Sequence, residues 1–208
     1  MEACRAINVA ATTSSSSSKG KAVFVQPLDL ADLNSIRDFC QAVNEEYDRI
    51  DVLVNNAGRN SAGIETESPS LALPSNQESP IKTDLVFHTK FLGHFLLTNL
   101  LLTKCQRIVN LASVMHHFPV YARADKDAIG SRQYWRANVV EPVAVDGGCV
   151  RKTYGPSKFA ALLFSVEFNR RYRKSLGIQS IALNPGSVYS DIWRNYGKFR
   201  KHCPDVST

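Results

Sequence analysis

The chain of 208 residues has no apolar run of the roughly 18–20 residues that a membrane-spanning helix needs. Its longest candidate, from Phe91 to Leu102, is interrupted by Gly93, His94, Thr98 and Asn99. The first residues also lack the apolar core of a secretory signal. These absences predict no transmembrane segment and no export. They favour a protein that is cytoplasmic or peripheral to an intracellular membrane.

Disulfide and metal patterns are missing as well. The five cysteines are odd in number and scattered, and they form no CxxC or Cys/His pattern. We therefore expect free thiols in a reducing compartment and no metal site. With 44% hydrophobic and 21% charged residues, the composition excludes collagen, wholesale disorder and a disulfide-held miniprotein. The length suits one domain with at most a short appendage.

The chain is basic, with a net charge of +6, and much of the excess lies late, between Arg170 and Lys201. Such an excess suits nucleic acid, an anionic lipid surface or a phosphorylated cofactor. Because no nucleic-acid motif and no interleaved aromatic residues accompany it, we expect no nucleic-acid partner. A solvated basic helix face is the plainer interpretation.

Segments of strand and helix character alternate along the chain, which predicts an α/β fold with a parallel sheet. A domain of residues 22–193 is expected, with a flexible low-complexity start at 1–21, loop insertions at 59–80 and 116–153, and a basic tail at 194–208. The expected strands are Ala22 to Leu30, Asp51 to Val54, Arg107 to Ala112 and Gln179 to Leu183, and the expected helices are Ala31 to Tyr47, Ile81 to Cys105 and Tyr154 to Leu176.

The sharpest chemical feature is a tyrosine followed four residues later by a lysine, Tyr154 and Lys158. On a helix the two side chains lie one turn apart on the same face. The ammonium charge favours the tyrosinate, so that the phenol can donate or accept a proton. Taken alone, the pair is equally a surface Tyr and Lys on a solvated helix.

The residues that end the neighbouring strands strengthen the catalytic interpretation. The carboxyl ends of parallel strands meet at one edge, where ligands bind. Ser113, the turn Asn55 to Gly58, the turn Pro185-Gly186 and the start of the Tyr154 helix should therefore converge on one crevice. There the Ser113 hydroxyl could hydrogen-bond a substrate carbonyl oxygen and stabilise its developing charge.

With these motifs in this order, the chain resembles the short-chain dehydrogenase/reductase family, and most closely its retinol-dehydrogenase-like branch. The resemblance covers roughly Ala3 to Trp193 and implies a Rossmann-type parallel sheet with helices on both faces. The matching stretches are Ala3-Cys4-Arg5, Leu28-Asp29-Leu30, Asn55 to Gly58, Leu92 to Thr98, Arg107 to Ser113, Tyr154 to Lys158 and Asn184 to Asp191.

The resemblance also implies roles for single residues. Tyr154 matches the catalytic acid/base, Lys158 the residue that holds the nicotinamide ribose, and Ser113 the substrate-polarising serine. Arg5 matches a basic residue that meets the 2′-phosphate of NADP, which makes NADP(H) the preferred cofactor and NAD(H) the alternative. The implied cofactor-binding residues are Arg5, Asp29, Asn55, Ala57, Gly58, Tyr154, Lys158, Pro185, Gly186, Val188 and Ser190. Plainer interpretations stay open: a tail residue for Arg5, a helix cap for Asp29 and a turn former for Asn55.

The sequence departs from the family pattern in three places. The family's glycine-rich TGxxxGxG loop has no counterpart, so we expect a fold truncated at its start and lacking the first βαβ unit. Lys90 stands where the family has an asparagine that completes a proton relay, and a lysine offers no hydrogen-bond acceptor. The insertion before Tyr154 is interpreted either as a substrate lid or as retained or disordered sequence.

Two functions follow from these matches and departures. The first is an NADP(H)-dependent oxidoreductase that transfers hydride to or from a small carbonyl or alcohol substrate, for instance a lipophilic one. The alternative is a truncated, non-catalytic relative that cannot bind the dinucleotide. In either case the resemblance implies a homo- or heterodimer formed through the helices Ile81–Cys105 and Tyr154–Leu176.

Overall fold

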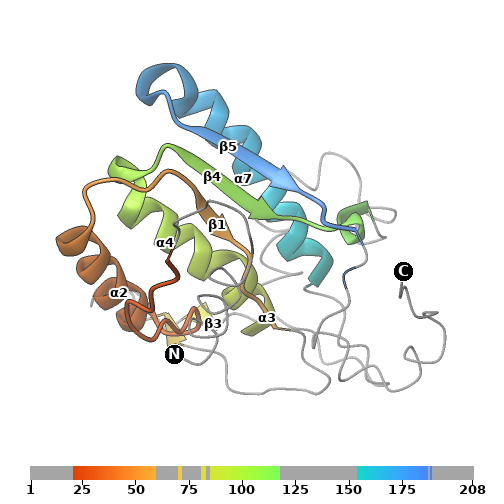
Figure 1. The fold of residues 1–208 in the computed structure, drawn as a ribbon. Helices are drawn as coiled ribbons and strands as arrows, with labels where there is room; N and C mark the ends of the chain where they lie inside the picture. The colour runs from red at the N-terminus through yellow and green to blue at the C-terminus, as the bar shows by residue number, and fades with distance from the viewer. Residues whose placement is uncertain are drawn as a thin grey trace, which may run out of the picture.

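The centre of the protein is a three-stranded parallel sheet in a computed structural model that describes residues 21–59, 70–71, 81–82, 85–117, 154–186 and 188. The spatial order of the strands is β1 (Leu53–Asn55), β4 (Arg107–Leu111) and β5 (Gln179–Leu183) (Figure 1). All three run in the same direction, so their carboxyl ends meet at one edge. The predicted α/β fold with a parallel sheet is confirmed.

Three long helices pack on one face of this sheet: α2 (Leu33–Glu46), α4 (Gly93–Leu101) and α7 (Tyr154–Leu176). Figure 1 shows α4 and α7 behind the strands. The helices bury their apolar sides together with Ile108 of β4, which is fully enclosed. The helical members of this core are Ile36, Cys40 and Val43 from α2, Leu97 and Leu101 from α4, and Phe168 from α7.

The opposite face of the sheet is apolar and exposed. Successive side chains of a strand point to opposite faces. Val54 of β1 is accordingly 54% exposed, and Ile181 and Leu183 of β5 are exposed as well. None of the three long helices among the described residues covers this face.

Local sequence explains two helices that begin and end close to where they were expected. Helix α2 follows the N-cap Asp32, whose carboxylate accepts a hydrogen bond of 2.8 Å from the Asn34 amide. Helix α7 spans the predicted residues in full. Pro156 lies in its first turn, where the missing N–H has no helical partner. Gly177 follows its last residue with φ 69°, the left-handed conformation that favours glycine.

The predicted helix Ile81–Cys105 is wrong at its start and ends within one residue of its predicted end. Ile81–Lys82 is strand β3, which pairs antiparallel with β2 (Ser70–Leu71), inside what was expected to be the loop 59–80. Helix begins at α3 (Leu85–Phe87), widens into the π-helical turn η1 (His88–Leu92), continues as α4 and ends in the 3-10 turn η2 (Leu102–Lys104). A π turn inserts an extra residue into the helical repeat and often marks a functional position. Here it carries Lys90.

The expected insertion 116–153 is likewise corrected at its start. His116 and His117 belong to the 3-10 helix η3 (Val114–His117). The remaining residues of that insertion, the segment 1–20 and the basic tail lie outside the described residues.

The predicted strand Ala22–Leu30 is also wrong, since the structure forms no strand there. A strand needs a neighbouring strand to pair its backbone groups, and the described part of the chain provides none beside this segment. The segment instead ends in a turn, with the Asp32 amide bonded to the Asp29 carbonyl. The apolar pattern of this segment correctly indicated that Leu30 is buried in the core. The same pattern could not show whether the segment would form backbone hydrogen bonds with a neighbouring strand.

The stretch Leu85–Lys104, 20 residues long, is long and apolar enough to meet the length and composition criterion for a membrane-spanning helix. In this structure 56% of its most apolar 18-residue window is buried inside the protein. A helix that lines the core of a folded domain meets the same criterion.

Candidate active site

Tyr154 and Lys158 lie together at the carboxyl edge of the sheet, as the sequence predicted. The Lys158 ammonium is 5.9 Å from the centre of the Tyr154 ring. It also donates a hydrogen bond of 2.5 Å to the carbonyl of Leu111, the last residue of β4. The lysine is thus held between α7 and the sheet. Burial lowers the pKa of Lys158 to about 8.

Ser113 follows the end of β4 and reaches the same edge. Its hydroxyl accepts a hydrogen bond of 3.3 Å from the Met115 amide. Helix η3, which starts at the next residue, packs against the start of α7 at Gly155. A Cβ on Gly155 would stand 3.1 Å from the Met115 carbonyl oxygen, so the missing side chain permits this close approach. The packing brings Ser113 and Tyr154 to one end of the sheet.

Lys90, which stands at the position of the family's proton-relay asparagine, is also a neighbour of Tyr154. Its ammonium lies 4.8 Å from the ring centre, closer than that of Lys158, and the residue is only 5% exposed. A Cβ on Gly58 would lie 2.8 Å from the same nitrogen, so Lys90 fills the space that the glycine leaves. Burial, and next the charge of Lys158, lower the pKa of Lys90 to about 7.

A network of buried polar side chains lies between the sheet and helices α4 and α7, next to the site. The Asn55 amide donates to the Thr98 hydroxyl at 2.9 Å and to the Asn110 carbonyl oxygen at 2.8 Å. The Asn110 amide donates in turn to the hydroxyls of Ser165 and Ser180 at 2.9 and 3.1 Å. The network therefore ties β1, β4 and β5 to α4 and α7. Because satisfied buried polar groups accept few other arrangements, it fixes the register between sheet and helices.

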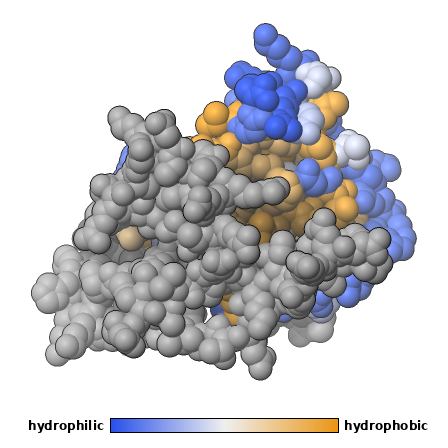
Figure 2. Space-filling model, turned by 180° about the vertical axis from the view of Figure 1, so that it is seen from behind, coloured by the Kyte–Doolittle hydropathy of each residue, from blue (hydrophilic) through white to orange (hydrophobic). Residues whose placement is uncertain are grey.

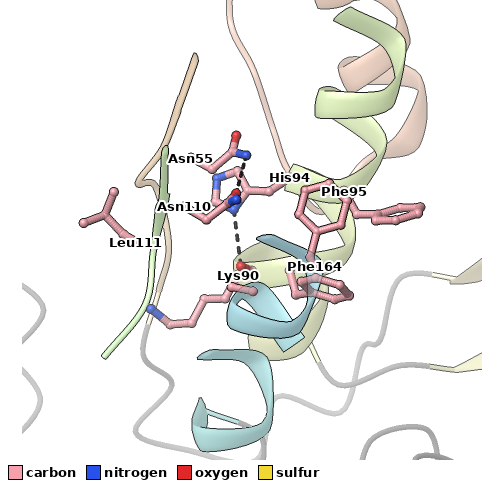
Figure 3. Close-up of a pocket in the computed structure, with 9 residues that line it drawn as sticks. Asn55, Lys90, His94, Phe95, Asn110, Leu111 and Phe164 are labelled. Carbon is pink, nitrogen blue, oxygen red and sulfur yellow. Dashed lines mark hydrogen bonds between the residues drawn. The ribbon is translucent and has the colours of Figure 1, made fainter. Parts of the chain in front are cut away.

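Figure 3 shows the hydrogen bond between Asn55 and Asn110. Both residues line a small cavity of about 10 Å³, which has room for one water molecule. The Asn55 carbonyl oxygen is buried and accepts no hydrogen bond from the described residues. The side chain of Asn55, which the sequence interpretation placed at the cofactor, takes part in this core network. That interpretation missed Asn110 and Ser180, although a polar residue inside each short apolar strand was a usable signal.

Most of the other implied cofactor residues lie on the surface. Asp29 is exposed ahead of α2, and its carboxylate accepts a hydrogen bond of 2.8 Å from the Ala31 amide. Ala57 and Gly58 follow β1 at the crevice edge. Arg5 and Ser190 lie outside the described residues. Three further residues are exposed after β5, namely Pro185, Gly186 and Val188.

Comparison with known proteins agrees with this geometry. Residues 3–125 match the family model described as short chain dehydrogenase. The chain is 34% identical over 175 residues to human retinol dehydrogenase 13, covering 82% of this chain and 44% of that protein. It is 31% identical over 208 residues to mouse retinol dehydrogenase 12, covering 93% and 54%. The chain thus spans about half the length of the curated relatives it matches.

Solved structures share the fold. A putative uncharacterized protein from Mycobacterium paratuberculosis superposes with a TM-score of 0.52 at 26% identity, covering 92% of this chain and 59% of that one. A short-chain dehydrogenase from Streptomyces avermitilis gives 0.55 at 20% identity, covering 92% and 55%. Taken with the family match over more than half of its residues, these likenesses show that the chain belongs to the short-chain dehydrogenase family and is similar within it to the retinol dehydrogenases.

Proposed function

We propose that this protein is an oxidoreductase that transfers hydride between a nicotinamide dinucleotide and a carbonyl or alcohol substrate, with Ser113, Tyr154 and Lys158 as the catalytic residues. One observation carries the proposal. The Lys158 ammonium is buried, anchored on the Leu111 carbonyl and directed at the ring of Tyr154. A surface Tyr and Lys pair would have neither the burial nor the anchor.

The residues at this edge fit the nicotinamide and ribose half of such a cofactor. Tyr154 and Lys158 present a hydroxyl and an ammonium, which suit ribose hydroxyls. The turn after β1 offers backbone without a side chain at Gly58. The exception is Lys90, whose ammonium fills part of that space. The nicotinamide and ribose therefore fit at this edge only if the Lys90 side chain stays packed against the Tyr154 ring and leaves the rest of the space free.

The chain's own residues supply the proton chemistry. In the reduction direction the Tyr154 hydroxyl donates its proton to the substrate oxygen, and in the oxidation direction the phenolate accepts it. The Ser113 hydroxyl donates a hydrogen bond to the same oxygen and stabilises its developing charge. The ammonium of Lys158 stabilises the phenolate by its charge. When bound, the dinucleotide supplies or accepts the hydride.

We assign NADP(H) as the preferred form, with NAD(H) as the alternative, because Arg5 offers a guanidinium suited to a 2′-phosphate. A lipophilic substrate is proposed because the relatives with about one third identical residues are retinol dehydrogenases. The cofactor assignment is tested by measuring the binding of NADPH and of NADH to the full chain and to its Arg5→Ala variant. We expect the variant to lose affinity for NADPH and to keep its affinity for NADH.

Replacing Tyr154 by phenylalanine should lower turnover at least about a hundredfold, because the ring stays and only the proton donor is lost. Turnover is measured by the change in NADPH absorbance with an aldehyde substrate. Tyr172→Phe, on the same helix α7, is the matched control and should keep wild-type turnover. Equal rates in wild type and Tyr154→Phe would refute the catalytic assignment. Absence of NADPH binding to the wild-type chain in calorimetry would favour the non-catalytic alternative.

We further propose that α4 and α7 form a dimer interface. Exposed apolar side chains from both helices, including Phe95, Leu163 and Val166, gather on one surface, seen as the orange area in Figure 2. Phe95 and Phe164 lie with ring centres 5.4 Å apart, so the two helices share this surface. An apolar patch of this kind commonly marks an association site.

A charge placed in this patch should produce a monomer. Val166, at 61% exposure the most exposed of these side chains, is replaced by glutamate, which keeps the helix but puts an unpaired charge into the interface. Sedimentation velocity measures the oligomeric state. Lys174→Glu, also exposed on α7, is the control and should remain dimeric. A wild-type chain that sediments as a monomer at high concentration would contradict the proposal.

A further inference from the structure

The amine of Lys90 is the one buried charged group at this edge for which the hydride-transfer mechanism has no use. The residue is 5% exposed, and its nitrogen lies between the face of the Tyr154 ring and the backbone of Gly58. Gly58 itself is exposed, and the amine fills the space that its missing side chain leaves. In Figure 3 the side chain extends from its helix toward the strand that carries Leu111.

Unlike Lys158 and Lys104, Lys90 has no oxygen acceptor among the described residues. Lys158 donates to the Leu111 carbonyl, and Lys104 donates to the Tyr47 carbonyl at 2.6 Å. For Lys90, no hydrogen bond or ion pair from the amine is formed within the described residues, and its single interaction there is with the Tyr154 ring. An ammonium without a carboxylate or carbonyl partner is costly to bury. The neutral amine is therefore favoured.

The groups around Lys90 act in two directions, since the charge of Lys158 disfavours the ammonium while the face of the Tyr154 ring attracts it. Helix α7 contributes Lys158 and Tyr154, and the helix of Lys90 contributes His88 and His94. Burial lowers the pKa of His94 to about 4 and lowers that of His88, so both rings are neutral near pH 7. The facing residues of β1 and β4 are the uncharged Asn55 and Asn110. With the pKa of Lys90 near 7, a large fraction of its amine carries a free lone pair at neutral pH.

We propose that Lys90 is a nucleophilic amine that condenses with an aldehyde or ketone entering beside Gly58 and Tyr154, forming an imine. The Nζ lone pair attacks the carbonyl carbon, and a C–N bond forms. The carbonyl oxygen takes up two protons, at least one of them from the amine, and leaves as water while the C=N bond forms, so no redox partner is needed. Burial beside a second cation is a recognised way to activate a lysine for this reaction.

Reductive trapping tests the proposal on the full chain without any dinucleotide. The protein is treated with hexanal and sodium cyanoborohydride between pH 6 and 9, and labelled lysines are identified by peptide mass spectrometry. At pH 7, Lys90 should be labelled at least about tenfold faster than the exposed Lys174, because an ordinary lysine has its pKa near 10.4. Its rate should level off above about pH 8, as expected for a pKa of about 7.

Lys90→Arg is the matched variant, since it keeps a cation and removes the nucleophile. Label at this position should vanish while label on Lys174 stays unchanged. Lys158→Met should move the midpoint of Lys90 labelling to higher pH, because the neighbouring charge is gone. If wild-type Lys90 reacts no faster than Lys174, or if Lys158 reacts first, the proposal is wrong. The labelling rates of Lys90 and Lys174 are compared within the wild-type chain, so the proposal is tested even if a variant does not fold. Because trapping needs no dinucleotide, its failure would leave the hydride-transfer proposal standing.

Discussion

Replacement of Lys90 by methionine should stabilise this protein by roughly 2–4 kcal/mol at pH 7. A shift of the lysine pKa from 10.5 to about 7 corresponds to a penalty of about 4 kcal/mol at that pH. Loss of the contact with the Tyr154 ring offsets up to about 2 kcal/mol of the gain. Methionine retains most of the aliphatic length and needs no hydrogen-bond partner.

The pH dependence gives the sharper test. The folded-state pKa of Lys90 is below the unfolded one, so the unfolded chain binds the extra proton between about pH 7 and 10.5. The penalty is fully present below pH 7 and disappears as the pH rises toward 10.5. The advantage of Lys90→Met in urea denaturation should therefore be largest at or below pH 7 and shrink at higher pH. The charges of Lys158 and Lys90 act on each other, so the difference between the two proteins also contains the change in Lys158 titration when Lys90 is removed.

Exposed Lys174 provides the control for this measurement. Lys174→Met should change the free energy of unfolding by no more than about 0.5 kcal/mol at any pH, as is usual for surface positions. A Lys90→Met protein that is less stable than wild type at pH 7 would show that the buried amine is well accommodated. The nucleophile proposal would then lose its physical basis too.

Gly93→Ala should destabilise the protein by about 3 kcal/mol or more. Helix propensity by itself favours alanine by about 1 kcal/mol, and the backbone of Gly93 is ordinary right-handed helix. The space available for the new methyl group decides whether the substitution stabilises or destabilises the protein. An added Cβ would stand 2.4 Å from the Leu30 carbonyl oxygen and 2.9 Å from the Leu30 Cβ, both fixed parts of the core. Overpacking against backbone costs more than propensity returns.

Gly177→Ala is the matched comparison for Gly93→Ala. No atom lies within 4 Å of a Cβ built at Gly177, so its cost comes from its positive φ alone and should be about 1 kcal/mol. Urea denaturation of the two variants under the same conditions measures the difference. If Gly93→Ala were as stable as wild type, the close approach of Leu30 to α4 would be wrong. That approach fixes the segment of Asp29 against the helix that carries Lys90.

Several parts of this fold were open to prediction because their signals are local. Helix α7 has its proline in the first turn and its glycine after the last residue, and it occurs as expected. The strand Gln179–Leu183 was also predicted with its observed limits. The strand predicted over Ala22–Leu30 failed, since pairing depends on a neighbour that local patterning does not reveal.

The candidate site divides in the same way. The order of Ser113, Tyr154 and Lys158, each after a strand or at a helix start, was sufficient to predict that they gather at one sheet edge. The resemblance placed Lys90 at the proton-relay position, but its burial was not predictable, because three elements distant in sequence enclose it: the turn at Gly58, the π turn η1 and helix α7. The buried network around Asn110 was hidden for a similar reason, since its partners lie 55 and 70 residues away.

The sequence by itself determined the α/β class, the parallel sheet and the family to which this chain belongs, because periodicity, caps and short motifs act over a few residues. Only the tertiary structure decided which charges are buried and beside what they lie. The sequence shows a lysine in the same way whether water or an aromatic ring surrounds its amine. The pKa of the amine, the free energy of burying it and its reactivity depend on that environment, which only the packing of the folded chain creates.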